Sequence, residues 1–289
     1  MLTRRAFSGM VAAAAFAPRV GVGQVVSPLT DRFSVMIWVL RKRGSFDENL
    51  EMVAKAGFRH IELIGEFYKW SDAERKHYLQ RMAALGITVD ATTGLKLGFA
   101  DTGGPAAYVE DLKRAIVAAK QVGCNRLVLM SGKVLPAVGD ERQREAAIAA
   151  LKAAAPVLEA EKMSVLLEPI DRLENPTYWM DTVEEAATIT RAVASPRVRV
   201  LYDLYHEQRT KGNLLAKLER VIDQVDVVHV ADVPRRSDPG TGEVNWPNVY
   251  RALKRLNYRG MIAMEFYPDG EPVEALRRAR LEAERELGG

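Results

Sequence analysis

The sequence has a single cysteine, four histidines and little net charge for its 289 residues. One cysteine, Cys124, excludes an internal disulfide framework and any metal site built from several cysteines. It lies in the apolar stretch GCNRLVLM, so we expect a small buried side chain there. A formal net charge of +3 is too small to favour nucleic acid as a partner. After the N-terminal segment, no stretch approaches the roughly 20 apolar residues that a membrane span requires.

The first residues differ in composition from the rest of the chain. Residues 1–26 have a basic start, an alanine-rich apolar centre and small residues after it. The segment TRRAF is typical of a twin-arginine export signal, although a short N-terminal helix is the alternative. We therefore predict an exported, periplasmic protein whose folded domain spans 27–289, or a cytoplasmic one if the signal is not functional. Pro18 directly follows the small-x-small sequence at 15–17, so signal cleavage stays open.

Short apolar runs alternate with longer helical patterns along the rest of the chain. Near-continuous apolar runs indicate strands that are covered on both faces. Eight strands alternating with helices over this length match a single-domain (β/α)8 TIM barrel. An open, doubly wound sheet is the alternative, but no G-x-G-x-x-G follows the first run. The predicted strands are 32–40, 58–64, 86–92, 125–130, 164–170, 198–204, 225–231 and 260–266.

The segments between these runs have apolar residues at the i, i+3, i+4 and i+7 spacing of amphipathic helices. In YVEDLKRAIVAAKQVG, one face collects Tyr108, Leu112, Ile116 and Ala119. A second helix is predicted over REAAIAALKAAAPVLEAEK. Proline lacks a backbone N–H and disturbs a helix interior, so Pro156 is predicted to end this helix early or to kink it.

Strands five to eight each carry a polar residue at or near the C-terminal end of the apolar run. These residues are spaced by 35, 26 and 36 residues, about one strand–helix unit each. In a parallel barrel such positions meet at one level, at the mouth where active sites form. The four residues are Glu168, Asp203, His229 and Glu265.

Three carboxylates that face one another repel unless protons or a cation neutralise them. A divalent cation removes this repulsion directly. Three carboxylates and one imidazole form a mostly oxygen-donating set, which suits Mn2+ or Mg2+ better than a thiolate-rich zinc site would. We therefore predict one metal site shared by the four residues, although any one acid alone could instead cap the following helix.

Other polar residues lie near the same end of the predicted barrel. His206 directly follows strand six and is expected to face the mouth. Glu62 has the same strand-end position, and a substrate contact or a capping role are both open for it. His60 and His77 are assigned to packing or solvent.

The stretch VVHVADVPRRSDPGTGEVNW combines a buried strand with a polar loop. Asp232 begins the loop, where turn formation and catalysis remain equally open. Arg235 and Arg236 together are predicted to clamp a carboxylate or hydroxyl groups of a substrate.

Read together, several segments resemble the hydroxypyruvate isomerase group of the xylose-isomerase-like TIM-barrel superfamily. The resemblance covers roughly residues 31–275, and the ADVP…PGTGE segment is the most specific part. It implies that Glu168, Asp203, His229 and Glu265 bind the metal, with Glu168 and Glu265 also acting as the acid–base pair. The matching segments are AGFRHIEL, LLEPIDRLENPTYWM, YDLYHEQ, HVADVPRRSDPGTGEVNW and MIAMEFYP.

The same resemblance makes His206 a substrate contact and assigns one arginine of the strand-seven loop to substrate oxygens. The hydroxypyruvate isomerase pattern selects Arg236, whereas the ketose 3-epimerase pattern selects Arg235. Hydroxypyruvate isomerases tend to have glutamine after strand seven, whereas His229 matches the epimerases. An export signal also leaves room for another sugar or sugar acid as substrate.

The predicted activity is a metal-dependent isomerisation of short hydroxy-carbonyl compounds, of the hydroxypyruvate/tartronate semialdehyde type. A metal holding the carbonyl and the neighbouring hydroxyl stabilises an enediolate, and the glutamates transfer the proton. Return of the proton to the same carbon gives a ketose 3-epimerase or another sugar epimerase instead.

Two alternatives come from other classes: a non-catalytic sugar-binding protein, and a DNA-processing enzyme related to endonuclease IV. The latter assembles a zinc cluster from more histidines than this chain offers. The expected partner is therefore a small sugar or hydroxy-keto acid, and no nucleic acid is expected. A homo-oligomer is compatible with the sequence.

Overall fold

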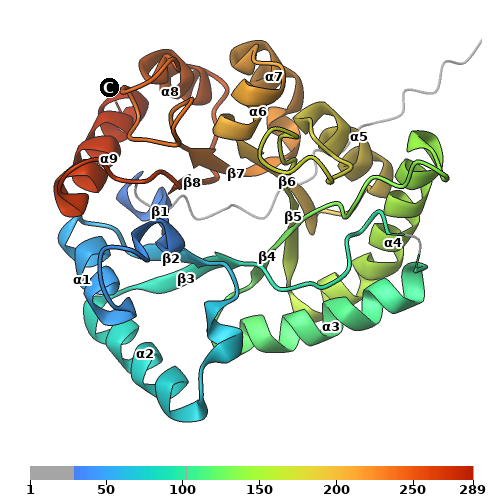
Figure 1. Ribbon diagram of the computed structural model, residues 1–289, viewed down its shortest axis with the longest axis horizontal. Coiled ribbons are helices and arrows are strands. Elements are labelled where there is room, and N and C mark those ends of the chain that lie inside the picture. Colours follow the sequence, from blue (N-terminus) through green and yellow to red (C-terminus); the bar gives the residue numbers. More distant parts are fainter. Residues whose placement is uncertain (1–28, 102, 289) are drawn as a thin grey trace, which may run out of the picture.

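A computed structural model describes residues 29–101 and 103–288, and in it eight parallel strands form a closed barrel in chain order (Figure 1). This confirms the predicted (β/α)8 fold, while the predicted export signal at 1–26 lies outside the described residues. The strands are β1 (Phe33–Met36), β2 (His60–Leu63), β3 (Thr88–Thr92), β4 (Arg126–Leu129), β5 (Ser164–Leu167), β6 (Val198–Asp203), β7 (Val225–Val230) and β8 (Met261–Met264).

Helices surround the barrel, and α9 packs against α1, so the outer layer is closed as well (Figure 1). Within the described residues, none of these helices has the length and apolar character needed to cross a bilayer. The α-helices are α1 (Phe46–Lys55), α2 (Asp72–Leu85), α3 (Pro105–Gln121), α4 (Asp140–Glu161), α5 (Val183–Val193), α6 (Leu204–Thr210), α7 (Leu214–Val221), α8 (Trp246–Arg255) and α9 (Pro272–Gly288).

The first predicted strand is shorter in the structure than in the sequence analysis. After β1 the chain turns at Met36 into the short 3-10 helix η2 (Ile37–Leu40). Ile37, Val39 and Leu40 are all buried, so the apolar run that predicted a long strand continues through a different backbone conformation. These side chains would be buried in a continued strand as they are in η2, so the sequence does not indicate the turn.

Helix α4 passes through Pro156, so Pro156 does not end the helix early, and the alternative of a kink stays a prediction. Pro156 and Lys152 both lie on the exposed side of the helix. Water can therefore bind the Lys152 carbonyl that has no N–H partner at Pro156. The opposite face, with Leu151, Ala154 and Leu158, is buried against the barrel and stabilises the helix on both sides of the proline.

The alternation of side chains along the strands separates two apolar clusters. The larger cluster lies between barrel and helices and includes Tyr108, Leu112, Ile116 and Ala119 of α3, as their spacing predicted, and also Cys124. The smaller cluster comes from β3 to β8, and we place it inside the barrel because its members alternate with those of the larger one. It consists of Ala91, Val128, Leu166, Leu201, Val227, Met261 and Ala263.

Candidate active site

The structure brings together the four polar residues predicted at the ends of β5 to β8. Asp203 is the last residue of β6, His229 lies one residue before the end of β7, and Glu168 and Glu265 directly follow β5 and β8. One ligand atom from each lies within 4.8 Å of the others. All four side chains are buried.

Backbone hydrogen bonds keep these residues at one level. Asp203 is paired with His229 in the register of β6 and β7. The Glu265 N–H donates to the Val230 carbonyl over 3.0 Å, and the Glu168 N–H donates to the Leu129 carbonyl over 3.1 Å. Both glutamates therefore continue the barrel's hydrogen-bonding pattern, which limits the freedom of their backbone.

Asp203 also begins helix α6. One of its oxygens accepts the N–H of Tyr205 over 2.8 Å, which is a helix N-cap. The other oxygen lies 3.3 Å from the Arg236 guanidinium and 3.4 Å from Nε2 of His206. The capping role and the place in the cluster are therefore compatible, because each uses a different oxygen.

His229 lies between carboxylates on both sides of its ring. Nδ1 is 2.7 Å from Glu265 Oε2 and 3.9 Å from Glu168 Oε1. Nε2 is 2.9 Å from Glu62 Oε2. Burial opposes the charged form, but Glu62 and Glu265 outweigh it and raise the pKa of His229 well above its usual range.

The two glutamates of the cluster differ in charge state. Burial raises the pKa of Glu168 to about 8. The neighbouring His229 lowers this pKa, whereas the carboxylates of Glu265 and Asp203 raise it further. Burial acts in the same direction on Glu265, but Arg236 and His229 outweigh it and hold the pKa of Glu265 far below its usual range. At neutral pH, and without a cation, Glu168 is therefore protonated and Glu265 ionised.

Only one of the two neighbouring arginines enters the cluster. The Arg236 guanidinium lies 2.8 Å from Glu265 Oε2 and 3.0 Å from Glu174 Oε1. It packs over the rings of Trp38 and Tyr205. Arg235 is exposed. The structure therefore places Arg236 at the cluster, and the assignment of one of the two arginines to substrate oxygens stays a prediction.

His206 reaches the cluster from α6 and is held by a carboxylate. Its Nδ1 lies 2.6 Å from Asp171 Oδ2, and its Nε2 faces Asp203. Burial opposes the shift, but Asp203 and Asp171 raise the pKa of His206 to about 9. Asp171 and Glu174 form a second acidic group with His206. Arg209 pairs with both acids, so that group is already neutralised.

Asp232 stabilises the loop after β7. The sequence left turn formation and catalysis both open for this residue. Its carboxylate accepts N–H groups of Val233, Gly240 and Val244 and the indole N–H of Trp246. The side chain is fully buried, and none of these hydrogen bonds joins it to a residue of the cluster. Turn formation therefore accounts for this residue.

Glu62, for which a substrate contact and a capping role were both open, lies beside His229. It is fully buried, on β2, with its carboxylate against His229. His60 and His77, assigned to packing or solvent, bind Thr88 and Asp47 instead of the cluster.

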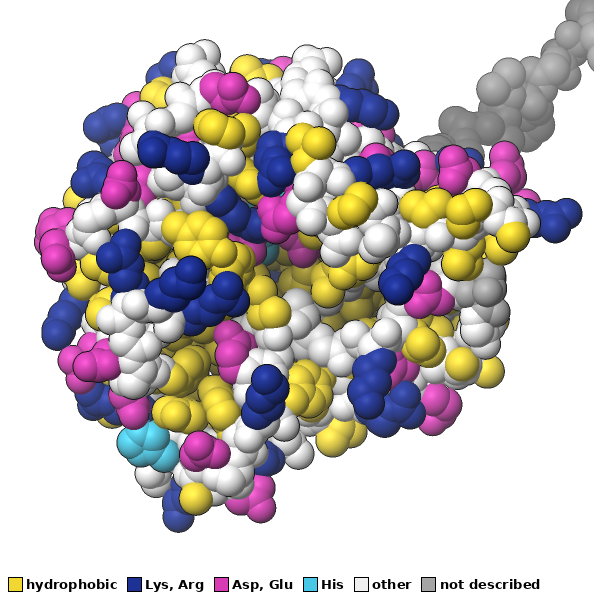
Figure 2. Space-filling view, in the orientation of Figure 1, with side chains coloured by type: hydrophobic (Ala, Val, Ile, Leu, Met, Phe, Trp, Pro, Cys, Tyr) yellow, Lys and Arg dark blue, Asp and Glu magenta, His cyan; other side chains and the backbone are white. Residues whose placement is uncertain are grey.

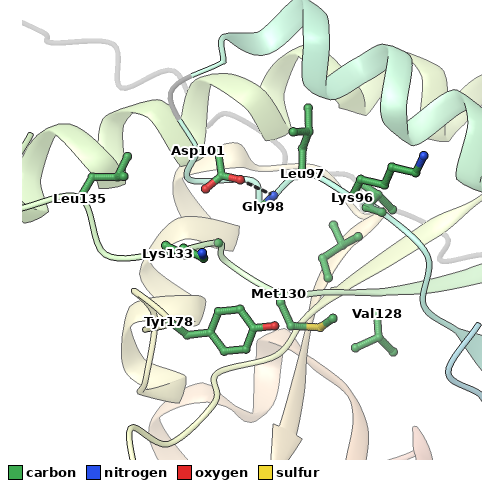
Figure 3. A pocket seen from close by; sticks show the side chains of 12 residues that line it. Lys96, Leu97, Gly98, Asp101, Val128, Met130, Lys133, Leu135 and Tyr178 are labelled. Carbon is green, nitrogen blue, oxygen red and sulfur yellow. Dashed lines mark hydrogen bonds between the residues drawn. The ribbon is translucent and has the colours of Figure 1, made fainter. Parts of the chain in front are cut away.

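A pocket of about 340 Å³ lies beside β4. Strand β4 pairs with β5, and Glu168 directly follows β5. In Figure 3 the hydroxyl end of Tyr178 points toward Met130, whose side chain extends on toward Val128. The loop after β3 is held at this pocket by Asp101, which accepts the Gly98 N–H over 2.7 Å. The surface is hollowed near the centre of the face in Figure 2, where acidic side chains lie beside hydrophobic ones.

Three residues at this mouth were missed in the sequence analysis. Asp171 and Glu174 lie within the quoted segment LLEPIDRLENPTYWM, so their polar character in a strand-end loop was a usable signal. Trp38 donates its indole N–H to Glu265 Oε1 over 3.2 Å. It lies within an apolar run that predicted a strand, so no sequence signal pointed to it.

The donor set fits a divalent cation. Three carboxylates and an imidazole converge within 4.8 Å. Burial raises the pKa of Glu168, and Glu265 and Asp203 add to this effect, so ionisation of all three acids requires added positive charge nearby. His229 and Arg236 supply that charge in the arrangement described here. Oxygen-rich sites of this kind suit Mn2+ or Mg2+.

Comparisons with known proteins agree with this geometry. The family model described as "Xylose isomerase-like TIM barrel" matches residues 50–285. A relative from Homo sapiens, whose name places it among the hydroxypyruvate isomerases, is 32% identical over 85% of this chain and 92% of its own. The 2-oxo-tetronate isomerase of Cupriavidus necator is 28% identical over 82% of this chain and 93% of its own.

Solved structures share the fold. The AP endonuclease, family 2, of Brucella melitensis has a TM-score of 0.76 and 25% identity, over 85% of this chain and 96% of its own. A D-psicose 3-epimerase has a TM-score of 0.74 and 19% identity, over 89% of this chain and all of its own, which shows the fold alone. The chain belongs to the xylose isomerase-like TIM barrel family, within its hydroxypyruvate isomerase group.

Proposed function

We propose that the chain is a metal-dependent isomerase that interconverts hydroxypyruvate and tartronate semialdehyde, or a closely similar short hydroxy-keto acid. The observation that carries this proposal is the convergence of Glu168, Asp203, His229 and Glu265 within 4.8 Å at the mouth of the barrel. The names of the relatives, hydroxypyruvate isomerase and 2-oxo-tetronate isomerase, support the substrate class.

A bound Mn2+ or Mg2+ would supply the positive charge that polarises the substrate carbonyl and acidifies the neighbouring C–H. Glu168 and Glu265 come from the outer two of four neighbouring strands, so a substrate over the cluster meets a glutamate on each side. One glutamate removes the proton from the hydroxyl-bearing carbon, and a glutamate returns a proton to the former carbonyl carbon. The hydroxyl proton moves to the other oxygen, so no proton is gained or lost.

The difference between the two glutamates supports this assignment. Two carboxyl groups whose surroundings separate their pKa values can serve as proton donor and proton acceptor in one reaction. Glu265 pairs with Arg236 and accepts the Trp38 indole N–H, whereas Glu168 makes neither contact, so the two glutamates differ in their surroundings even when a cation replaces the Glu168 proton. The pocket beside β4 offers space for the part of the substrate that does not react.

A ketose 3-epimerase is the second candidate, and His229 is the observation that favours it. The imidazole at this position matches the ketose 3-epimerases, as the resemblance in the sequence implies. The same glutamates could return the proton to the opposite face of the same carbon. The two reactions differ in product, so they can be told apart by assay.

The test is a substrate panel with the metal-reconstituted enzyme. The purified chain is loaded with Mn2+, Mg2+ or Zn2+ and offered hydroxypyruvate, a four-carbon 2-oxo acid and several ketohexoses in deuterated water, with products followed by NMR. We expect turnover of the hydroxy-keto acids, loss of activity on chelation, and a loss of about 10⁴-fold in Glu168→Gln because a proton-transfer group and a metal ligand are removed together.

Several results would contradict the proposal. Full activity after chelation or in Glu168→Gln would end it. Epimerised ketoses without isomerised acids would favour the second candidate. Ligand binding without deuterium exchange at carbon would favour the sugar-binding alternative, and cleavage of abasic-site DNA would favour the nuclease.

A further inference from the structure

Glu62 contacts the cluster from the opposite half of the barrel. It lies on β2, whereas its neighbour His229 lies on β7. Glu62 alternates with Ile61 and Leu63, which belong to the outer core, so its side chain points into the barrel. The carboxylate is fully buried, and the distance from Oε2 to His229 Nε2 is 2.9 Å.

The two nitrogens of His229 face different groups. Nδ1 faces Glu265 and Glu168, on the side where the four candidate ligands converge. Nε2 faces Glu62 alone. An imidazole that binds a cation through Nδ1 carries its single N–H on Nε2, and a buried N–H requires an acceptor. Glu62 is the group positioned to be that acceptor.

No other hydrogen-bond partner among the described residues competes for the Glu62 carboxylate. Neither of its oxygens meets the geometric criteria for a hydrogen bond, and neither does Nε2 of His229. The pair therefore lies at contact distance, but the Nε2–H direction is well away from the line to Oε2. A reorientation of the ring or of the carboxylate would give each of these two buried groups a partner.

We propose that Glu62 is a positioning residue for His229. By accepting the Nε2 proton, it fixes the tautomer and the ring orientation in which Nδ1 faces the metal-binding cluster. Carboxylates that hold a ligating histidine in this way strengthen metal binding without touching the metal. This inference rests on the proposed function only in that a divalent cation binds the cluster.

His206 provides an internal parallel. Its Nδ1 is hydrogen bonded to the buried Asp171, and its Nε2 faces Asp203. Each histidine at the mouth thus has one nitrogen on a carboxylate and the other toward the cluster. The two differ in the nitrogen used, because His229 presents Nδ1 and His206 presents Nε2.

The first measurement is Mn2+ affinity by calorimetry in three variants. Glu62→Leu removes the acceptor and is expected to weaken Mn2+ binding by about 10- to 100-fold. Glu62→Gln keeps an amide oxygen in nearly the same place, so it should restore most of the affinity. The control is Glu207→Gln, another buried carboxylate, which pairs with Lys217 away from the cluster. It should leave the Mn2+ affinity unchanged.

The second measurement is the protonation of His229 in the wild-type chain with Mg2+ bound, by ¹⁵N NMR. With four histidines in the chain, a His229→Asn spectrum assigns the signal. We expect the proton on Nε2 and none on Nδ1. This reading does not depend on the folding of any Glu62 variant.

Two outcomes would overturn the inference: an Mn2+ affinity that is the same in Glu62→Leu as in the wild type, or a proton on Nδ1 with Nε2 unprotonated. A higher KM with unchanged metal affinity would return Glu62 to the predicted substrate contact. If metal binding depends on Glu62 but no hydroxy-keto acid is isomerised, only the proposed function fails. If the wild type binds no divalent cation, both fail.

Discussion

The two halves of the barrel mouth differ in what their strands carry. At or next to the C-terminal ends of β5 to β8 lie four buried residues whose ligand atoms are within 4.8 Å of one another: Glu168, Asp203, His229 and Glu265. Strands β1 to β4 are followed there by mostly apolar or neutral residues and by the pocket that Met130 and Tyr178 line. Glu62 is the exception, since it crosses the barrel to His229.

This difference has an electrostatic basis. Buried charges are tolerated where they compensate one another, so the acids, His229 and Arg236 collect on the same side. The pocket on the other side is lined by fewer acids, with Asp101 beside Lys96 and Lys133 among mostly apolar residues. We propose that the residues of β5–β8 carry the chemistry and that those of β1–β4 select the substrate, and each prediction below tests this proposal.

Among substitutions outside the four candidate metal ligands, the largest effect is expected from Arg236→Ala. Its guanidinium is buried between Trp38 and Tyr205 and pairs with Glu265, Asp203 and Glu174. Truncating one partner of a buried charge pair costs 2–5 kcal/mol, so kcat/KM should fall by about 10²-fold or more. The measurement is steady-state kinetics on the best substrate of the panel.

Arg235→Ala is the matched control, because Arg235 is the exposed neighbour in the same loop. Its kcat/KM should stay within about twofold of the wild type, as for surface substitutions in general. If Arg235→Ala were the more damaging change, the loop would have to rearrange on substrate binding. The epimerase pattern would then describe this chain better.

The residues at the site show which features a sequence can predict. A single acid at the end of a buried run can cap a helix, as Asp203 does, but capping does not explain four such positions one strand–helix unit apart, and these were enough to place the cluster. Arg236 and Arg235 could not be separated in this way. Arg236 is buried at the cluster and Arg235 is exposed because of the loop conformation that Asp232 stabilises and the left-handed backbone of Arg236, with φ of 55°.

Trp38 is the opposite case. Its contact with Glu265 joins residues 227 positions apart in the chain. It also depends on a turn after Met36 that keeps Ile37, Val39 and Leu40 buried, as a strand would. A sequence pattern indicates which residues are buried and with what spacing. It does not indicate a change from strand to 3-10 helix that leaves the same residues buried.

A smaller effect is expected from pH on metal affinity. Burial and the neighbouring acids raise the pKa of Glu168 to about 8, so below that pH a proton occupies a metal-binding oxygen. Affinity should therefore fall as pH falls. The Glu168 proton alone gives on the order of 80-fold weaker Mn2+ binding at pH 6 than at pH 8.5, and displacement of the His229 proton acts in the same direction.

Calorimetric titration at the two pH values measures this difference. Glu168→Gln serves as the control, since it removes the titrating group and should reduce the pH dependence by one proton. Equal affinity of the wild type at both pH values would show that the acids of β5–β8 are not as crowded as the structure describes.

The smallest effect, and the sharpest test of the division, is expected from Met130→Trp. The larger side chain reduces the pocket of about 340 Å³ on the β4 side. A four-carbon 2-oxo acid should lose about tenfold in kcat/KM, and a three-carbon acid less, because discrimination by pocket size is worth about 1–3 kcal/mol per methylene. Mn2+ affinity should not change. Val117→Trp, on the exposed side of α3, is the control for the added bulk. If Met130→Trp instead weakened Mn2+ binding as much as turnover, selection and chemistry would not be separable between the two halves.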